Sequence, residues 1–512
     1  MICHAPGRVR SEIGPLRSYT PSTMPLKICF ITAEMAPLAK AGGLADVSGA
    51  LLKYLHAAGH DIRLFMPAYG SIDQTQLDSQ PVAFLQDLSV RIGDDEIPFS
   101  VHTVRLPGSD ARAYLVDCPR YFHRGGIYGN APDEHRRFLL LTHAAFMSCQ
   151  HMAFAPDILH CHDWHTAVGT MWLRTAYDWD RLFAHTRSVL TIHNIGYQGI
   201  FPAAIATDLL PAHQHDALYQ ADLRAGHVNL LRLGLVYADL ITTVSPTYAR
   251  EILTPEYGHG MQDILRTRPN VLGILNGVDY EVWDPRHDPH LPEHYGANRL
   301  GRKAALKALL QARTGLQSGE RRALIGMVSR LAEQKGIDLL IDALPDLLAT
   351  RDFNLVVLGS GEARYEQFFH ALQVAHPGRV HLARGFSEDL SHWIEAGSDM
   401  FLMPSRYEPC GLNQLYSLRY GTVPIVRRTG GLADSVVHFD ADSGQGTGIV
   451  FNDYDANAVR WAVNTALDLY ARKGPWRRLV QNAMAQDFSW RRQVGEYERV
   501  YRQLLDSTPQ PM

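Results

Sequence analysis

Short apolar runs alternate along this chain with segments in which apolar residues recur at helical spacing. The first run, Lys27–Ala33, is typical of a buried strand. Apolar residues then recur at helical spacing from Leu44 to Leu55, and His60–Pro67 forms the next apolar run. A strand, a glycine turn, a helix and a strand in this order predict an α/β fold with a doubly wound parallel sheet.

The second half of the chain repeats this alternation. Apolar runs at 323–329, 354–359, 380–384 and 399–403 predict strands, and 337–348 predicts a helix. Between the halves, 287–301 is rich in His, Pro, Asp and Asn and has no period. The pattern predicts two Rossmann-like domains, at 26–270 and 271–484. A disordered leader at 1–25 precedes them, and 485–512 follows with a terminal helix.

The stretch Met403–Val436 holds the densest group of chemically useful residues. After an apolar run, Pro409 fits the first position of a helix, where its missing N–H is not needed. Glu408, Cys410 and Gly411 should then lie where a strand passes into a helix, beside free N–H groups that suit a phosphate. A phosphate does not need a carboxylate, so we expect Glu408 to act on another part of the ligand.

Two glycine pairs share the sequence Gly-Gly-Leu-Ala-Asp. One begins at Gly42 and Gly43, and the other begins at Gly430 and Gly431. A residue without Cβ lets the backbone approach a ligand closely. We interpret the two pairs as the same device, used once in each domain.

Polar residues follow several of the predicted strands, at the edge where open α/β sheets bind ligands. Arg330 and Lys335 provide two cations that suit a diphosphate, and Lys40 provides a third from the first half. Neutralised in this way, a diphosphate becomes a better leaving group without a metal ion. The D-x-D triplets at 440–442 and 453–455 lie in polar segments, and we interpret both as solvated turns.

Composition excludes several classes of protein. Of 512 residues, 46% are hydrophobic and 20% are charged, which is ordinary for a globular protein. The net charge of −4 favours neither a nucleic-acid nor a membrane surface, and no apolar run is long enough for a membrane span. Six cysteines without a C-x-x-C pair favour a reduced, cytoplasmic protein.

In their order along the chain, the motifs resemble the bacterial glycogen synthase and plant starch synthase family. Lys40–Val47 is similar to the family's K-T-G-G-L-A-D-V signature, with Ala41 in place of the usual Thr. Further matching segments are His162–His165, His193–Gly199, Val244–Ala249, Leu275–Asp279, Ser329–Gly336, Pro404–Leu412 and Arg428–Asp434. The resemblance runs from about Lys27 to Leu505.

The resemblance implies a GT-B glycosyltransferase of two facing domains whose terminal helix crosses back to the first domain. Such an enzyme transfers glucose from ADP-glucose to the non-reducing end of an α-1,4-glucan, with retention of configuration and without a metal or other cofactor. Lys40, Arg330 and Lys335 would contact the diphosphate, and Glu408 would be the essential acid beside the donor sugar. The other expected site residues are Gly42 and Gly43 at the glycine turn, His193 and Asn194 at the glucosyl unit, Asp46, Asp163 and Asn276 along the cleft, Cys410, Gly411 and Leu412 at the helix start, and Tyr128 near the nucleotide.

Structural interpretations of the same residues stay open at the sequence level. Glu408 could simply favour a helix dipole, and His193 could be a core histidine. Arg330 and Lys335 could be surface charges, and Cys410 a packed residue or a nucleophile. Two other functions also fit the pattern: a different GT-B chemistry, such as another retaining hexosyltransferase or a sugar-nucleotide epimerase, and a glucan-binding protein without activity.

Overall fold

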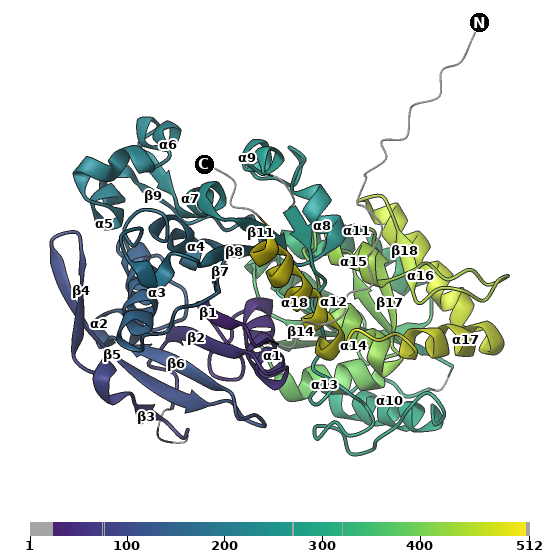
Figure 1. Ribbon diagram of the computed structural model, residues 1–512. Helices are drawn as coiled ribbons and strands as arrows, with labels where there is room; N and C mark the ends of the chain where they lie inside the picture. The colour runs from purple at the N-terminus through teal and green to yellow at the C-terminus, as the bar shows by residue number, and fades with distance from the viewer. Residues whose placement is uncertain (1–23, 74, 76, 269–270, 320, 508–512) are drawn as a thin grey trace, which may run out of the picture.

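The computed structural model describes residues 24–73, 75, 77–268, 271–319 and 321–507. The leader expected at 1–25 lies almost wholly outside the described residues. Two α/β units follow each other along the chain, each built on its own sheet (Figure 1). We call them the N-terminal and C-terminal domains.

The sheet of the N-terminal domain has the strand order β12-β11-β8-β7-β1-β2-β6-β5-β3, and β4 pairs with β5. Pairing is parallel from β12 to β6 and antiparallel beyond. The strands are β1 (Lys27–Ile31), β2 (Asp61–Pro67), β3 (Gln80–Pro81), β4 (Leu88–Ile92), β5 (Asp95–Arg105), β6 (Arg112–Asp117), β7 (Ile158–His162), β8 (Arg187–Ile192), β11 (Leu240–Thr243) and β12 (Val271–Gly273), while β9 (Ile200–Pro202) and β10 (His227–Asn229) form a separate pair. The parallel sheet predicted from the first apolar runs is confirmed.

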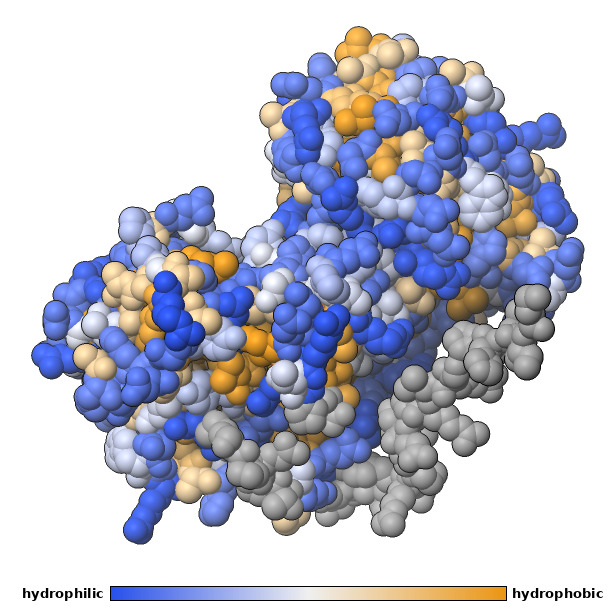
Figure 2. Space-filling view, turned by 90° about the horizontal axis from the view of Figure 1, so that it is seen from above, coloured by the Kyte–Doolittle hydropathy of each residue, from blue (hydrophilic) through white to orange (hydrophobic). Residues whose placement is uncertain are grey.

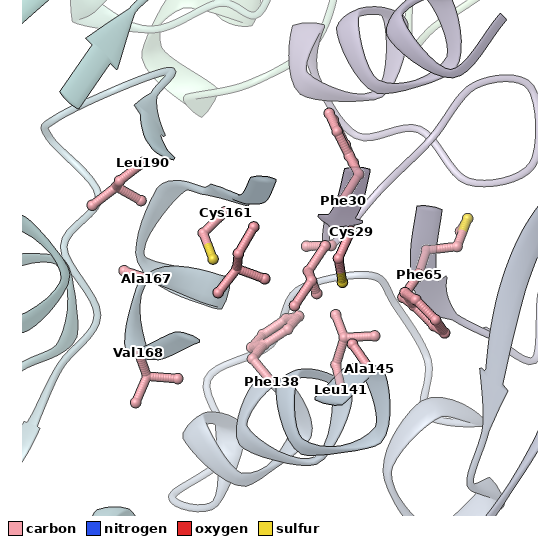
Figure 3. Close-up of a cluster of buried hydrophobic side chains, with 14 of the residues drawn as sticks. Cys29, Phe30, Phe65, Phe138, Leu141, Ala145, Cys161, Ala167, Val168 and Leu190 are labelled. Atoms are coloured by element: carbon pink, nitrogen blue, oxygen red, sulfur yellow. The ribbon is translucent and has the colours of Figure 1, made fainter. Parts of the chain in front are cut away.

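The helices of this domain are α1 (Gly43–Ala57), α2 (Pro119–Phe122), α3 (Glu134–His151), α4 (Asp163–Trp172), α5 (Ala206–Leu209), α6 (Gln220–Arg224), α7 (Leu230–Tyr237), α8 (Pro246–Glu251) and α9 (Gln262–Thr267). Figure 3 shows Phe65 on the side of the sheet that faces Phe138 and Leu141 of α3, whereas Phe30 points to the opposite side. All four side chains are fully buried, and each such burial contributes roughly 1.5–3 kcal/mol. This core fixes the strand ends that carry the site.

The boundary between the domains lies beyond the position expected from the sequence. β12 pairs with β11 at Ile241–Val271, so the first sheet continues past residue 270. The first sheet thus ends at Gly273, three residues past the expected limit of 270.

The C-terminal domain has an all-parallel sheet with the order β15-β14-β13-β16-β17-β18. Its strands are β13 (Ala323–Val328), β14 (Phe353–Gly359), β15 (Val380–Arg384), β16 (Met400–Met403), β17 (Val423–Arg427) and β18 (Ile449–Phe451). Its helices are α10 (Gly301–Thr314), α11 (Ile337–Thr350), α12 (Ala363–Ala375), α13 (Glu388–Gly397), α14 (Asn413–Tyr420), α15 (Gly430–Ser435), α16 (Ala456–Tyr470) and α17 (Lys473–Met484). Two parallel-sheet domains in one chain are the GT-B arrangement.

The last helix, α18 (Trp490–Asp506), returns to the N-terminal domain and packs on α1 (Figure 1). Tyr497 and Tyr501 are buried in the N-terminal core, and the Tyr501 hydroxyl lies 2.8 Å from His160 Nδ1. The chain passes between the domains twice, once near Val278 and once near Phe488. These two segments lie side by side, because the Val278 N–H donates to the Phe488 carbonyl at 2.7 Å. The chain therefore joins the two domains at one narrow place.

Candidate active site

A cavity of about 1390 Å³ lies between the two domains, and the surface is hollowed between its two lobes (Figure 2). Its walls include every site residue expected from the sequence: Lys40, Gly42, Gly43, Asp46, Tyr128, Asp163, His193, Asn194, Asn276, Arg330, Lys335, Glu408, Cys410, Gly411 and Leu412. Residues from both halves of the chain therefore face one cleft, and their individual roles stay predictions.

A buried carboxylate holds the glycine loop on the N-terminal side. Glu34 follows the end of β1, and it accepts the backbone N–H groups of Ala41 and Gly42. Its other oxygen accepts the Tyr128 hydroxyl at 2.8 Å. Burial raises the pKa of Glu34, while these hydrogen bonds lower it. One side chain thus joins the Lys40 loop to the Tyr128 loop.

This arrangement explains how the chain tolerates Ala41. Helix α1 begins after Gly42 without any side-chain cap, and Glu34 supplies acceptors to the loop instead. Lys40 Nζ lies 2.7 Å from Asp46 Oδ1 in the first turn of α1. Burial raises the pKa of Asp46, and the nearby Lys40 charge lowers it. The loop is ordered without a threonine hydroxyl.

The turn after β8 presents His193 and Asn194 to the cleft. Asp163 Oδ1 accepts the backbone N–H of His193 at 2.7 Å and that of Asn194 at 3.4 Å. His193 Nε2 lies 2.9 Å from His162 Nδ1. Burial lowers the pKa of His193 to about 3 and raises the pKa of Asp163 to about 7. His193 is therefore a neutral hydrogen-bonding group at pH 7, and Asp163 orders the turn that carries it.

An ion pair dominates the C-terminal side. Lys335 Nζ lies 2.6 Å from Glu408 Oε2, and the Ser405 hydroxyl donates to the same oxygen at 3.0 Å. Arg330 reaches across the cleft instead, where its Nη1 donates to the Tyr197 hydroxyl at 3.2 Å. Both cations thus line the cleft, but only Lys335 contacts Glu408.

The helix expected to begin at Pro409 begins four residues later. α14 starts at Asn413, and Pro409, Cys410 and Gly411 form a loop after β16. Gly411 has a φ of +73°, a left-handed conformation that ends any helical run before it. The predicted helix end is confirmed, since Gly421 closes α14 with a φ of +68°.

Cys410 is a packed residue in this loop. Its side chain is buried, and burial raises the pKa of its thiol. A thiol that stays protonated is a poor nucleophile. The contacts therefore favour packing beside a ligand over covalent chemistry.

Both Gly-Gly-Leu-Ala-Asp segments begin a helix, α1 at Gly43 and α15 at Gly430, as the shared pattern indicates, but their glycines have different surroundings. A Cβ on Gly43 would meet Leu412 Cδ1 at 3.6 Å, an ordinary contact, and Gly43 lines the cleft. A Cβ on Gly431 would lie 2.1 Å from the Cys410 carbonyl oxygen. The first pair leaves space for a ligand, whereas the second lets two backbones touch.

One group of metal-capable side chains occurs among the residues that the structure describes. It consists of Asp288, His290 and His392, none of which lines the cleft. The His290 and His392 rings are stacked at 4.3 Å, and His392 Nδ1 lies 2.8 Å from Asp288 Oδ2. Both Asp288 oxygens already accept hydrogen bonds, Oδ1 from the His290 backbone N–H at 2.9 Å and Oδ2 from the Tyr420 hydroxyl at 2.6 Å, so we interpret the group as a packed polar cluster. Asp440 and Asp442 lie in an exposed turn, as expected.

Two contributors were missed at the sequence level. Glu34 follows a strand by three residues, so the search for polar residues after strands could have found it. Tyr197 lies within the matching segment His193–Gly199, but no local pattern indicated its contact with Arg330, which is 133 residues away.

Comparisons with known proteins place the chain among carbohydrate-active enzymes. Residues 27–267 match the starch synthase catalytic domain, and 311–484 match glycosyl transferases group 1. The glycogen synthase of Anaeromyxobacter dehalogenans strain 2CP-1 is 46% identical over 94% of this chain and 99% of its own length. That of Thermotoga maritima is 42% identical over 94% of this chain and 99% of its own length.

Solved structures agree with the sequence comparison. The catalytic domain of starch synthase IV from Arabidopsis thaliana, bound to ADP and acarbose, has a TM-score of 0.87 and 32% identity, covering 94% of this chain and 100% of that one. Sucrose-phosphate synthase from Thermosynechococcus elongatus has a TM-score of 0.60 and 16% identity over 94% of this chain and 99% of that one, which shows a shared fold. In the described part of the chain, no helix has the length and apolar character of a membrane span.

Proposed function

The chain belongs to the glycogen synthase and starch synthase family of glycosyltransferases, and from that premise we propose that it extends α-1,4-glucans with glucose from ADP-glucose. The glucosyl unit joins the non-reducing end with retention of configuration, and ADP is released. The observation that carries this proposal is the Lys335–Glu408 ion pair, which faces Lys40, His193 and Asn194 across one cleft.

The choice of ADP rests on two supports. The Arabidopsis starch synthase IV structure holds ADP, and the cleft of this chain has cations from both domains for a diphosphate. Phe386 is 73% exposed and lines the same cleft, so its ring is available as a wall for the base.

In the proposed reaction, Lys40, Arg330 and Lys335 neutralise the departing diphosphate. Glu408 and His193 lie by the donor sugar as an oxocarbenium-like centre develops. The glucan hydroxyl attacks from the face that the diphosphate leaves, and the departing phosphate accepts its proton. Closure of the two domains around the substrates excludes water, so transfer outcompetes hydrolysis.

No metal ion is part of this proposal, because three cationic side chains supply the charge that a metal would. The partners are ADP-glucose and an α-1,4-glucan, without nucleic acid or membrane. The described cysteines are all unpaired, which supports the reduced, cytoplasmic setting that the sequence suggests.

The test is ADP or UDP release with ADP-glucose or UDP-glucose, each measured with and without glycogen. We expect release from ADP-glucose that requires glycogen and lengthens its chains. Equal or greater turnover of UDP-glucose would overturn the donor assignment. Glucan binding without turnover of either donor would instead identify an inactive binding protein. A covalent glucosyl adduct on Asp46, Asp163 or Glu408 would overturn the single-step mechanism.

A further inference from the structure

Two short helices from different domains satisfy each other's free backbone groups. Asp434 of α15 accepts the Thr247 backbone N–H and the Thr247 hydroxyl of α8, both at 2.7 Å. Glu251 of α8 accepts the Gly430 backbone N–H and the Thr429 hydroxyl at the start of α15, both at 3.0 Å. Each helix start is therefore capped by an acid from the other domain.

This junction lies directly behind the segment that carries Glu408. The Gly431 backbone N–H donates to the Glu408 carbonyl oxygen at 3.0 Å. The Ser245 hydroxyl, at the start of α8, donates to the Pro409 carbonyl oxygen at 2.6 Å. The two peptide units that flank Pro409 are thus held by one group from each domain.

The contact between α15 and the segment that carries Glu408 is too close for the two backbones to move independently. A Cβ on Gly430 would lie 1.9 Å from the Glu408 carbonyl oxygen, and Gly430 has a φ of +43°. A movement of α15 must therefore move the Glu408 backbone as well. The Glu408 side chain contacts Lys335 at the other end of the same residue, so its position depends on both contacts.

We propose that the paired caps of α8 and α15, made by Glu251 and Asp434, form an interdomain clamp that positions Glu408 for glucosyl transfer. Both acids are positioning residues, since they hydrogen-bond to the starts of α8 and α15 and neither lines the cleft. The inference rests on the proposed function only for its kinetic consequence. Its structural part stands on the contacts themselves.

Loss of Glu251 leaves buried donors without a partner, and loss of Asp434 leaves the donors of the half-buried Thr247 without one. Thr429 is 1% exposed, and removal of Glu251 would deprive its hydroxyl and the Gly430 N–H of their acceptor. Buried donors without acceptors are unfavourable, so the turn at Gly430 would shift to find water. The shift passes to Glu408 through the Gly431 hydrogen bond.

The kinetic test compares Glu251→Ala and Asp434→Ala with Glu251→Gln and Asp434→Asn. We expect kcat with ADP-glucose and glycogen to fall 10- to 100-fold in the alanine variants, while the KM for ADP-glucose and the Kd for ADP change less than threefold. The amide variants keep an acceptor oxygen and should recover most of kcat. Asp346→Ala, which removes an ion pair with Arg460 on the surface, should match the parent. A kcat within twofold of the parent in both alanine variants would overturn the clamp.

Hydrogen exchange tests the clamp without reference to any donor. We expect the amides of 408–412 and 429–431 to exchange at least tenfold faster in the alanine variants than in the parent, and unchanged exchange would overturn the clamp. If the parent has no transferase activity, the proposed function fails while this measurement still decides the structural part. If an alanine variant does not fold, Thr247→Val removes the hydroxyl contacts to Asp434 and Arg250 but keeps the backbone N–H contact to Asp434, and should give the same changes at smaller size.

Discussion

Lys335 Nζ lies 2.6 Å from Glu408 Oε2, and the two side chains are 19% and 6% exposed. A buried carboxylate beside a half-buried ammonium fixes both groups in the wall of the cleft. A bound diphosphate would compete with Glu408 for the same cation. The pair therefore links donor binding to the freedom of the carboxylate.

This competition gives opposite predictions for the two residues. Lys335→Ala should weaken ADP binding and lower kcat/KM for ADP-glucose by about 10²–10³, because one charged donor to the leaving group is lost. Glu408→Gln should bind ADP as tightly as the parent or more tightly, since Lys335 is released, while kcat falls. Calorimetry with ADP and steady-state kinetics check both, with Lys473→Ala on the exposed start of α17 as the control. Weaker ADP binding by Glu408→Gln would contradict the competition.

Glu34 should be essential for the order of the glycine loop. Glu34→Ala removes the acceptor of two backbone N–H groups and the partner of Tyr128, so the loop that carries Lys40 loses the contacts that order it. We expect the KM for ADP-glucose to rise at least tenfold. Glu34→Gln keeps an acceptor oxygen and should retain most of the activity, and Tyr128→Phe should lose less than Glu34→Ala. Steady-state kinetics of the three variants check this ranking of their activities.

The two glycine pairs should respond differently to a methyl group. Gly431→Ala forces a Cβ to 2.1 Å from a backbone oxygen, so we expect the free energy of unfolding to fall by about 3 kcal/mol or more. In Gly43→Ala the new Cβ has an ordinary 3.6 Å contact, so its Tm should match the parent. Its donor KM should rise instead, because the methyl group projects toward the cleft. Thermal unfolding and kinetics of both variants test the contrast, and equal losses of Tm would contradict it.

Stability should fall as the pH drops below 6.5. Burial lowers the pKa of four histidines to about 3: His143, His160, His165 and His193. Between pH 3 and 6.5 the unfolded chain therefore binds more protons than the folded chain, and the free energy of unfolding decreases as protons are added. Burial raises the pKa of Asp163 to about 7 and of Glu395 to about 8, so these groups act in the opposite direction. Burial also lowers the pKa of His162, His381 and His438 and raises that of Glu34, Asp46 and Glu251. Seven histidines therefore oppose five carboxyl groups, and we expect the histidine effect to dominate, at about 1.4 kcal/mol per pH unit for each uncompensated group.

Urea unfolding at pH 5.0, 5.5, 6.0 and 6.5 measures this proton uptake. His160→Gln should reduce the uptake by about one proton per molecule. His185→Gln, at an exposed position, should leave the uptake unchanged. A free energy of unfolding that is flat or rises toward pH 5 would contradict the prediction.

Local patterns determined much of the fold. The apolar runs at Lys27–Ala33 and 354–359 became buried parallel strands, because a strand covered on both faces excludes polar residues over its own length. Gly421 ended a helix for an equally local reason, the left-handed backbone that glycine adopts freely. The position of polar residues after strands also predicted which side chains share the cleft, since the carboxyl ends of parallel strands lie at one edge.

Only the tertiary structure decided what those residues contact. Pro409 is compatible with a helix start, yet Ser245 from the other domain holds its carbonyl oxygen in a loop. The two Gly-Gly-Leu-Ala-Asp segments are identical in sequence, but one borders the cleft and the other packs beneath Glu408. The hydrogen bonds of Ser245 and Thr247 to the other domain join residues that are 164 or more positions apart in the sequence. Such contacts depend on how whole domains pack, and no local periodicity of the sequence determines them.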